Sequence, residues 1–270
     1  MTKNRITSCF EALGEKRRKA LISYLVGGDP SPEYTVDLMH SLVKEGTDII
    51  ELGVPFSDPS ADGPVIQRAH ERALEHKIGL GDIFEMVAEF RVRDAETPIV
   101  LMGYANPVEW MGAAKFCEKA TSAGVDGVLI VDLPPEESAA YSNLFAQYGL
   151  QNVFLLAPTT SHSRIEKICS IASGFLYYVS LKGVTGAGNL DINDVKNHVD
   201  RIQKTAEIPV CVGFGIKDAD SAQTVSAVAD GVVVGSAIVQ KVVAASSKQL
   251  AMQDIEAFVA ELRNAIDQAD

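Results

Sequence analysis

The sequence has no excess of positive charge and no long apolar run. Its 24 Lys and Arg residues stand against 36 Asp and Glu, which gives a formal net charge of −12 over 270 residues. That charge argues against nucleic acid or an anionic membrane as a partner. The most apolar stretches, 127–131 and 231–239, are far shorter than the roughly 18 residues that a membrane helix needs. The first residues also lack the apolar core of a secretory signal, so we expect a cytoplasmic protein with no membrane span.

Cysteine and histidine are scarce, and their spacing fits no metal site. The four cysteines are scattered without a C-x-x-C pair, and we interpret them as reduced structural thiols: Cys9, Cys117, Cys169 and Cys211. None of the five histidines has the close spacing of H-E-x-x-H, so we expect no metal. The first glycine turn, residues 26–30, also lacks the G-x-G-x-x-G that a doubly wound dinucleotide-binding sheet usually carries.

One rhythm repeats along the chain, in which a short apolar run is followed by Gly, Pro or Asp and then by an amphipathic helix. The apolar runs are 21–26, 48–52, 99–102, 127–131, 153–156, 175–179, 209–213 and 231–234. Most of them are apolar throughout, which is typical of parallel strands covered on both faces. The pattern predicts an α/β fold, a single (β/α)8 TIM barrel in which residues 1–270 form one domain. A doubly wound sheet is the alternative.

Two helices lie outside the eightfold count. Residues 2 to about 18 predict a leading helix, which would cover the open bottom of the barrel, and residues 80–93 predict an additional helix after the second strand. Helix starts are indicated by Ser31 before a proline, and by capping-box patterns at 82–85 and 163–166.

Glycines follow the last three predicted strands. They occur at 183–188, at 213–215 and at Gly235, which precedes Ser236 at the start of a predicted helix. Glycine lets the backbone approach an anion closely, and N–H groups at a helix start point toward it. Plain tight turns would also use glycine, but three such turns in succession favour a phosphate site built from backbone amides. The stretch 183–190 resembles in composition a lid that closes over that end.

Two carboxylates stand near the end of the second strand. Glu51 is a lone acid in an apolar run, and burial without a cation would raise its pKa into the range of a general acid and base. A hydrogen-bonded core glutamate, or one at an exposed strand end, is the alternative. Asp62 lies in the following loop, where turn or capping chemistry would also explain it. Together the two acids are placed to flank one substrate.

The segment that carries these acids has a recognisable signature. Residues 50–64 read IELGVPFSDPSADGP, which closely resembles the signature of tryptophan synthase alpha chains. Further matches follow in the same order along the chain: Gly28-Asp29-Pro30, Tyr104-Ala105-Asn106-Pro107, Val131-Asp132-Leu133-Pro134, Gly183-Val184-Thr185-Gly186, Gly213-Phe214-Gly215-Ile216 and Gly235-Ser236-Ala237. The resemblance implies a carbon–carbon lyase of tryptophan biosynthesis, which cleaves indole-3-glycerol phosphate to indole and glyceraldehyde 3-phosphate.

The resemblance also implies residue roles. Glu51 would be the general acid and base, and Asp62 would stabilise the indole N–H. Tyr177 would orient the glutamate, and Thr185 would contact the aspartate from the lid. The phosphate would be held by Gly186, Gly215, Gly235 and Ser236. The indole pocket would be lined by Tyr24, Met102, Leu155 and Phe214, for which ordinary barrel core is the alternative.

A partner is implied as well, since alpha chains of this family pair with a beta chain in an α2β2 complex. Pyridoxal phosphate is expected only on the beta chain, so this chain would need no cofactor. The loop 54–63 and the turn 104–108 are candidate contacts. Ser60 is polar where the family pattern usually has an aliphatic residue, and residues 181–182 lie where members of the family vary. In this family both loops border the lid or the partner subunit.

Two other functions stay open from the sequence. One is another phosphate-binding barrel, an isomerase or a Schiff-base aldolase that uses Lys182. We discount this lysine because a Schiff-base amine needs an apolar, desolvated site and Lys182 lies in a glycine-rich loop. The other is a non-catalytic subunit that only senses a phosphate ligand, which the paired Glu51 and Asp62 argue against.

Overall fold

The strands follow one another around a nearly closed barrel. The computed structural model describes residues 3–180, 192–213 and 215–269. Its strands are β1 (Ala20–Val26), β2 (Ile49–Gly53), β3 (Ile99–Gly103), β4 (Gly127–Ile130), β5 (Gln151–Asn152), β6 (Phe154–Leu156), β7 (Leu176–Val179), β8 (Val210–Gly213) and β9 (Gly231–Val234). They form one sheet in the order β5-β4-β3-β2-β1-β9-β8-β7-β6. The order follows the chain without the reversal of a doubly wound sheet, which confirms the predicted barrel.

The predicted fifth strand differs from its expected form. We expected one run over 153–156, but the structure has two short strands, β5 and β6, separated by Val153. β5 pairs with β4, whereas β6 pairs with β7. The chain therefore changes its neighbour at Val153, whose N–H still donates to the Val128 carbonyl at 2.9 Å. β5 and β6 are the two edge strands of the sheet, and they are consecutive in the chain. The change of pairing partner at Val153 therefore brings the two edges of the sheet next to each other.

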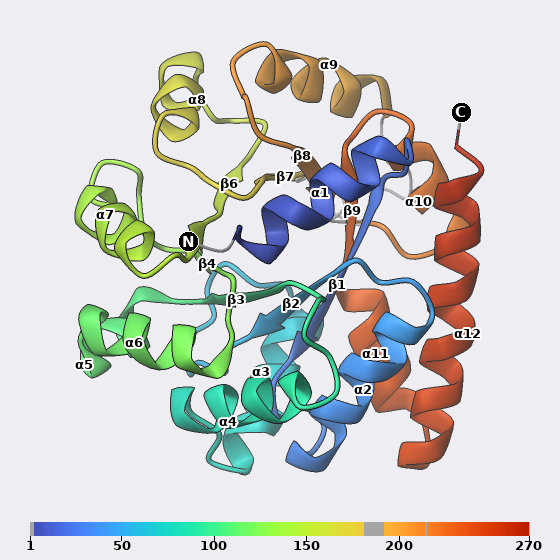
Figure 1. Ribbon diagram of the computed structural model, residues 1–270. Coiled ribbons are helices and arrows are strands. Elements are labelled where there is room, and N and C mark those ends of the chain that lie inside the picture. Colours follow the sequence, from blue (N-terminus) through green and yellow to red (C-terminus); the bar gives the residue numbers. More distant parts are fainter. Residues whose placement is uncertain (1–2, 181–191, 214, 270) are drawn as a thin grey trace.

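The helices surround the strands (Figure 1). They are α1 (Arg5–Glu15), α2 (Pro32–Lys44), α3 (Pro64–Glu75), α4 (Leu80–Arg91), α5 (Ala105–Met111), α6 (Ala113–Ala123), α7 (Ala139–Gln147), α8 (His162–Cys169), α9 (Ile192–Gln203), α10 (Ala219–Ser226), α11 (Ser236–Ala244) and α12 (Lys248–Asp267). The additional helix after the second strand is confirmed as α4. The sequence did not reveal that helix pairs also follow β3 and β9. Across the described ranges, no helix is both long and apolar enough to cross a membrane.

Helix starts were predicted with mixed success. Ser31 is the N-cap of α2, as expected. The capping boxes were placed wrongly, because α4 is capped at Gly79 and α8 at Ser161. Asp82 is the third residue of its helix, and its carboxylate accepts from the Gly79 N–H at 2.9 Å. The segment 104–108, expected as a turn, opens helix α5, in which Pro107 occupies the first turn, where its missing N–H costs no hydrogen bond.

Helix α1 closes the N-terminal end of the barrel. Its buried Ile6 and Leu13 pack among inward-facing strand residues such as Ile49 and Val100, and the helix crosses in front of the ring of strands in Figure 1. The Arg5 guanidinium pairs with Asp126 at 2.8 Å. This confirms the expected cover and leaves the carboxyl ends of the strands as the open end of the barrel.

Candidate active site

A cavity of about 360 Å³ opens at the carboxyl ends of the strands. This is the end at which barrels of this type build their active sites. Strands β1, β3, β6, β7 and β9 contribute to its wall. The rest comes from residues that follow β2, β4, β8 and β9, including the first turn of α3 and the start of α11. Its lining residues are Tyr24, Ala61, Asp62, Gly63, Pro64, Val65, Ile66, Met102, Val131, Leu155, Tyr177, Val179, Gly215, Ile216, Val233, Gly235 and Ser236.

Glu51 is buried inside the barrel next to this cavity. Side chains alternate along a strand, so Glu51 shares the inward face of β2 with Ile49. Its exposed fraction is 0%, and neither carboxylate oxygen has a hydrogen-bond partner among the residues that the structure describes. Loss of hydration disfavours the charged form and raises the pKa of Glu51 from 4.5 to about 8. The carboxyl group is therefore protonated near neutral pH, as a general acid requires.

Two tyrosines that line the cavity, Tyr24 and Tyr177, interact electrostatically with Glu51. Burial raises the pKa of both Tyr24 and Tyr177 well above its usual value, and the charges of Glu51 and Asp62 raise it further. Both phenols therefore stay protonated. Two glycines make room for them, since a Cβ atom on Gly53 or Gly213 would lie 2.4 Å from the hydroxyl of Tyr24 or Tyr177 respectively. The glycine at the end of β8, expected as part of a phosphate turn, thus accommodates a tyrosine.

Replacing Gly213 with alanine is expected to lower the free energy of unfolding by about 1–3 kcal/mol, because a methyl group would overlap the buried Tyr177 ring. Urea unfolding measures the effect. Gly81→Ala in α4 is the control: nothing lies within 4 Å of its added Cβ, so removing a helical glycine there should stabilise the chain by up to about 1 kcal/mol. A Gly213→Ala variant as stable as the original chain would contradict the packing argument.

Asp62 borders the cavity and is held from α5. Its side chain is 12% exposed, and its Oδ2 accepts a hydrogen bond from the Tyr104 hydroxyl at 2.6 Å. That hydroxyl in turn accepts from the Ala61 N–H at 3.1 Å, and the Phe56 ring stacks on the Tyr104 ring with centroids 4.8 Å apart. Burial and the hydrogen bond to Asp62 raise the pKa of Tyr104. The loop between β2 and α3 is thereby fixed to the start of α5.

The opposite part of the cavity is formed by backbone rather than by charge. Gly215 has a φ of +80°, a conformation that glycine adopts without strain. Gly235 is the N-cap of the nine-residue helix α11, which begins at Ser236. N–H groups at such a helix start favour an anion. None of the described lining residues is Lys or Arg, so an anion here would meet amides and a hydroxyl.

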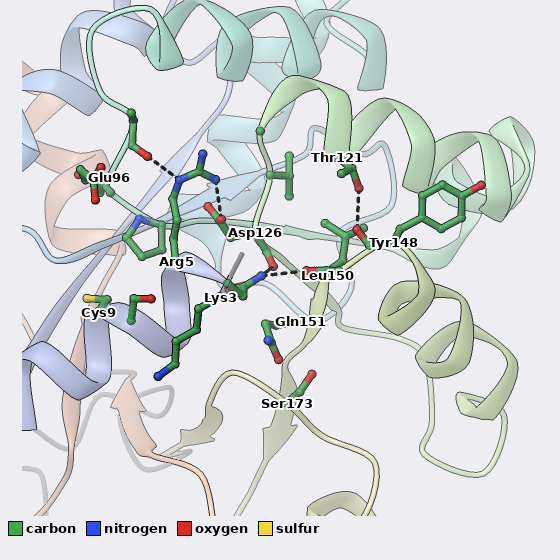
Figure 2. A pocket seen from close by; sticks show the side chains of 18 of the residues that line it. Lys3, Arg5, Cys9, Glu96, Thr121, Asp126, Tyr148, Leu150, Gln151 and Ser173 are labelled. Atoms are coloured by element: carbon green, nitrogen blue, oxygen red, sulfur yellow. Dashed lines mark hydrogen bonds and ion pairs between the residues drawn. The ribbon is translucent and has the colours of Figure 1, made fainter. Parts of the chain in front are cut away.

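A larger cavity, of about 1390 Å³, lies at the other end of the barrel (Figure 2). It is formed by α1 and by residues that precede the strands, and it includes neither Glu51 nor Asp62. Figure 2 shows Arg5 directed at Asp126, to which it is paired, and Arg5 also donates to the Ala95 carbonyl at 2.6 Å. Since these groups tie α1 to the barrel, we assign the active site to the smaller cavity.

Comparison with known proteins settles the family. The family model described as tryptophan synthase alpha chain matches residues 10–267. The chain belongs to the tryptophan synthase alpha chain family. The tryptophan synthase alpha chain of Thiobacillus denitrificans is 54% identical over 266 residues, which cover 98% of this chain and 97% of that one. The alpha chain of Chromobacterium violaceum is 55% identical over 263 residues, covering 97% and 99%.

A solved structure agrees with these relatives. The crystal structure of tryptophan synthase subunit alpha from Legionella pneumophila matches with a TM-score of 0.93 and 44% sequence identity, covering 98% of this chain and 99% of that chain. Membership of the tryptophan synthase alpha chain family confirms the resemblance seen in the sequence. It also confirms the predicted class of activity, a lyase that cleaves indole-3-glycerol phosphate.

Most of the site residues predicted from the sequence can be located. Eight of them line the smaller cavity: Tyr24, Asp62, Met102, Leu155, Tyr177, Gly215, Gly235 and Ser236. Glu51 lies outside the lining but within electrostatic reach of Tyr24 and Tyr177. Three others fall outside the described residues, namely Thr185, Gly186 and Phe214, and their roles stay predictions. Lys182, which we discounted as a Schiff-base amine, also lies outside them.

Two residues at the site were not singled out. Tyr104 belongs to the motif Tyr104-Ala105-Asn106-Pro107, but only as a family match, with no sign that its hydroxyl reaches Asp62. His70 lies on α3 with its ring facing the loop that carries Asp62. His70 lies about two turns into α3. No pattern in the sequence indicates which way its ring points.

Proposed function

We propose that Glu51 and Asp62 carry out the retro-aldol cleavage of indole-3-glycerol phosphate in the cavity at the carboxyl ends of the strands. The observation that supports this best is the environment of Glu51. Its carboxylate has no hydrogen-bond partner within the described part of the chain, and burial raises its pKa to about 8. Such a group can give a proton and take one back near neutral pH. Asp62, held at the cavity by Tyr104, supplies the second carboxylate.

The chemistry requires both groups. The carbon–carbon bond to be broken starts at indole C3, so C3 is first protonated by Glu51, which leaves positive charge on the ring nitrogen. Asp62 accepts the indole N–H hydrogen bond and stabilises that charge. The Glu51 carboxylate then takes the proton of the glycerol hydroxyl next to C3. As the aldehyde forms, the bond breaks and its electrons return to the indole ring.

The rest of the substrate would lie across the cavity. Gly215, Gly235 and Ser236 would hold the phosphate, together with Gly186, and the indole ring would contact Tyr24, Met102, Leu155 and Phe214. Tyr177 would orient Glu51, and Thr185 would meet Asp62 from the lid. Every proton transfer here is assigned to a side chain of this chain, so the proposal includes no cofactor.

The direct test is to incubate the purified chain with indole-3-glycerol phosphate and to measure indole and glyceraldehyde 3-phosphate. Equal amounts of both products are expected. Borohydride added during turnover should trap no substrate on Lys182, since the proposed route forms no Schiff base. Labelling of that lysine would support the aldolase alternative, and binding without product would support the ligand-sensing subunit.

We further propose that a tryptophan synthase beta chain, carrying pyridoxal phosphate, docks on the face formed by loop 54–63 and the start of α5 in an α2β2 complex. Trp110, the single tryptophan of the chain, is on α5 and is 88% exposed. An exposed aromatic of this size is typical of a protein contact. The free state of all four cysteines supports a cytoplasmic location for the complex.

Mixing with a beta chain should shift the fluorescence of Trp110 to shorter wavelength, because docking would remove its ring from water. The same titration should raise the rate of indole formation. A Trp110→Ala variant, which has no tryptophan, provides the spectral background of the beta chain. An increase in activity with no change in Trp110 fluorescence would place the partner on another face.

A further inference from the structure

His70 contacts the loop of Asp62 at two points. It lies on α3, and its exposed fraction is 2%. The Phe56 backbone N–H donates to Nδ1 of His70 at 3.2 Å. On the other side of the ring, Nε2 lies 3.6 Å from Oδ2 of Asp62. Nε2 has no hydrogen-bond partner in the described ranges, and the Asp62 carboxylate is the acceptor that this buried nitrogen faces.

The hydrogen bond to Nδ1 fixes the state of the ring. A backbone N–H can donate only to a ring nitrogen that carries no proton. Nδ1 is therefore unprotonated, and the neutral imidazole carries its single N–H on Nε2, toward Asp62. At 3.6 Å this N–H is just beyond hydrogen-bond range. A buried donor without an acceptor is costly, and a shift of well under 1 Å would satisfy it.

Tyr104 and His70 approach the same oxygen from different elements, Tyr104 from the N-cap of α5 and His70 from α3. The Tyr104 hydroxyl already donates to Oδ2 of Asp62 at 2.6 Å, and the His70 N–H faces that oxygen too. Once a small shift brings the His70 N–H within hydrogen-bond range, two donors on one oxygen fix the plane of the carboxylate. They leave Oδ1, which accepts no hydrogen bond from the described residues, to meet a ligand in the cavity.

We infer that His70 is a positioning residue that, with Tyr104, holds Asp62 so that its free oxygen accepts the indole N–H. The inference rests on the proposed role of Asp62. It gives His70 a selective effect, which is to strengthen binding of ligands that carry a ring N–H. Contacts to the phosphate and to the apolar face of the ring do not pass through His70 and are unaffected.

Two variants separate the two contacts of the ring. In His70→Asn, the side-chain oxygen replaces Nδ1 and keeps the contact with Phe56, but the donor toward Asp62 is lost. In His70→Gln, the amide reaches the position of Nε2 and keeps that donor. The probes are two uncleavable phosphate ligands that lack the glycerol hydroxyls, one an indole and the other its benzofuran counterpart, in which oxygen replaces N–H.

The measured quantity is the ratio of the two dissociation constants. The original chain and His70→Gln should bind the indole ligand more tightly than the benzofuran. In His70→Asn the dissociation constant of the indole ligand should rise about tenfold, while that of the benzofuran should change little. If His70→Asn keeps the preference and His70→Gln loses it, His70 only anchors the loop through Phe56, and the inference is wrong.

Asp62→Ala makes a failure of the inference distinguishable from a failure of the proposed function. If Asp62→Ala loses the indole preference while His70→Asn retains it, only the role of His70 is wrong. If the original chain shows no preference, the proposed role of Asp62 fails. An independent check needs no variant: ¹⁵N NMR of the ligand-bound chain should show His70 as the neutral Nε2–H form. A ring protonated on Nδ1 would overturn the inference.

Discussion

Replacing Glu51 with glutamine is expected to abolish indole release and to make the folded chain more stable at alkaline pH. Glutamine cannot protonate indole C3 or take the hydroxyl proton, so kcat should fall by at least about 10²–10⁴-fold, the usual contribution of a general acid and base. Binding of indole-3-glycerol phosphate should persist, because the phosphate and the indole ring keep their proposed contacts with other residues of the cavity. Steady-state kinetics and equilibrium binding together measure the two effects.

The stability effect follows from the raised pKa. Glu51 titrates near 4.5 in an unfolded chain and at about 8 when folded. Between these values the unfolded chain has released the proton and the folded chain has kept it. The contribution of Glu51 to the free energy of unfolding therefore falls as pH rises from 4.5 to about 8, and it is constant at higher pH. Each pKa unit corresponds to about 1.4 kcal/mol, so a rise in the pKa of Glu51 from 4.5 to about 8 corresponds to a loss of roughly 5 kcal/mol of stability at alkaline pH.

Urea unfolding at about pH 5 and about pH 9 measures this pH-dependent contribution of Glu51 to stability. The stability difference between Glu51→Gln and the original chain should grow by several kcal/mol from the lower to the higher pH. Glu118→Gln, at an exposed position on α6, is the matched control and should follow the original chain at both. Since the protonated form begins the reaction, kcat/KM of the original chain should also decline above about pH 8. A pH-independent difference would mean that Glu51 is ionised when folded.

The features that could be predicted from the sequence are those that depend on neighbouring residues. Apolar runs marked the strands because parallel strands are covered on both faces. Glu51 stood out because a lone acid in such a run has no local partner. Helix α4 was recognisable from its periodicity, although its cap was placed wrongly. The single-domain assignment of residues 1–270 stays a prediction.

The features that were missed depend on contacts between distant residues. Tyr104 and Asp62 are 42 positions apart, yet share a hydrogen bond. In the sequence, Gly213 is the point where a predicted strand meets a glycine turn. In the structure it must be glycine because the Tyr177 ring on the neighbouring strand fills the space of a side chain. The second helix after β3 escaped notice because α5 is only seven residues long. No local pattern carries this information, since it arises only when the barrel brings these residues together.

Asp62→Asn is expected to lower kcat by about 10²–10³-fold, because a neutral amide no longer balances the positive charge that develops on the indole ring. Loss of one such electrostatic contact costs about 3–4 kcal/mol in transition-state stabilisation. KM should change far less, since the phosphate and the apolar ring keep their contacts. Single-turnover measurement of indole formation gives the chemical step directly. A loss confined to KM would mean that Asp62 only binds substrate.

Tyr104→Phe tests whether the aspartate must be held in place. Removing the hydroxyl deletes the 2.6 Å hydrogen bond to Oδ2 and the contact with the Ala61 N–H, while the ring can still stack on Phe56. One hydrogen bond to a charged group is worth about 1.5–3 kcal/mol, so kcat should fall about tenfold or more. In the Asp62→Asn background the same change should cost much less, because its effect passes through the carboxylate. Additive losses in the double variant would instead mean that Tyr104 acts on the substrate independently of Asp62.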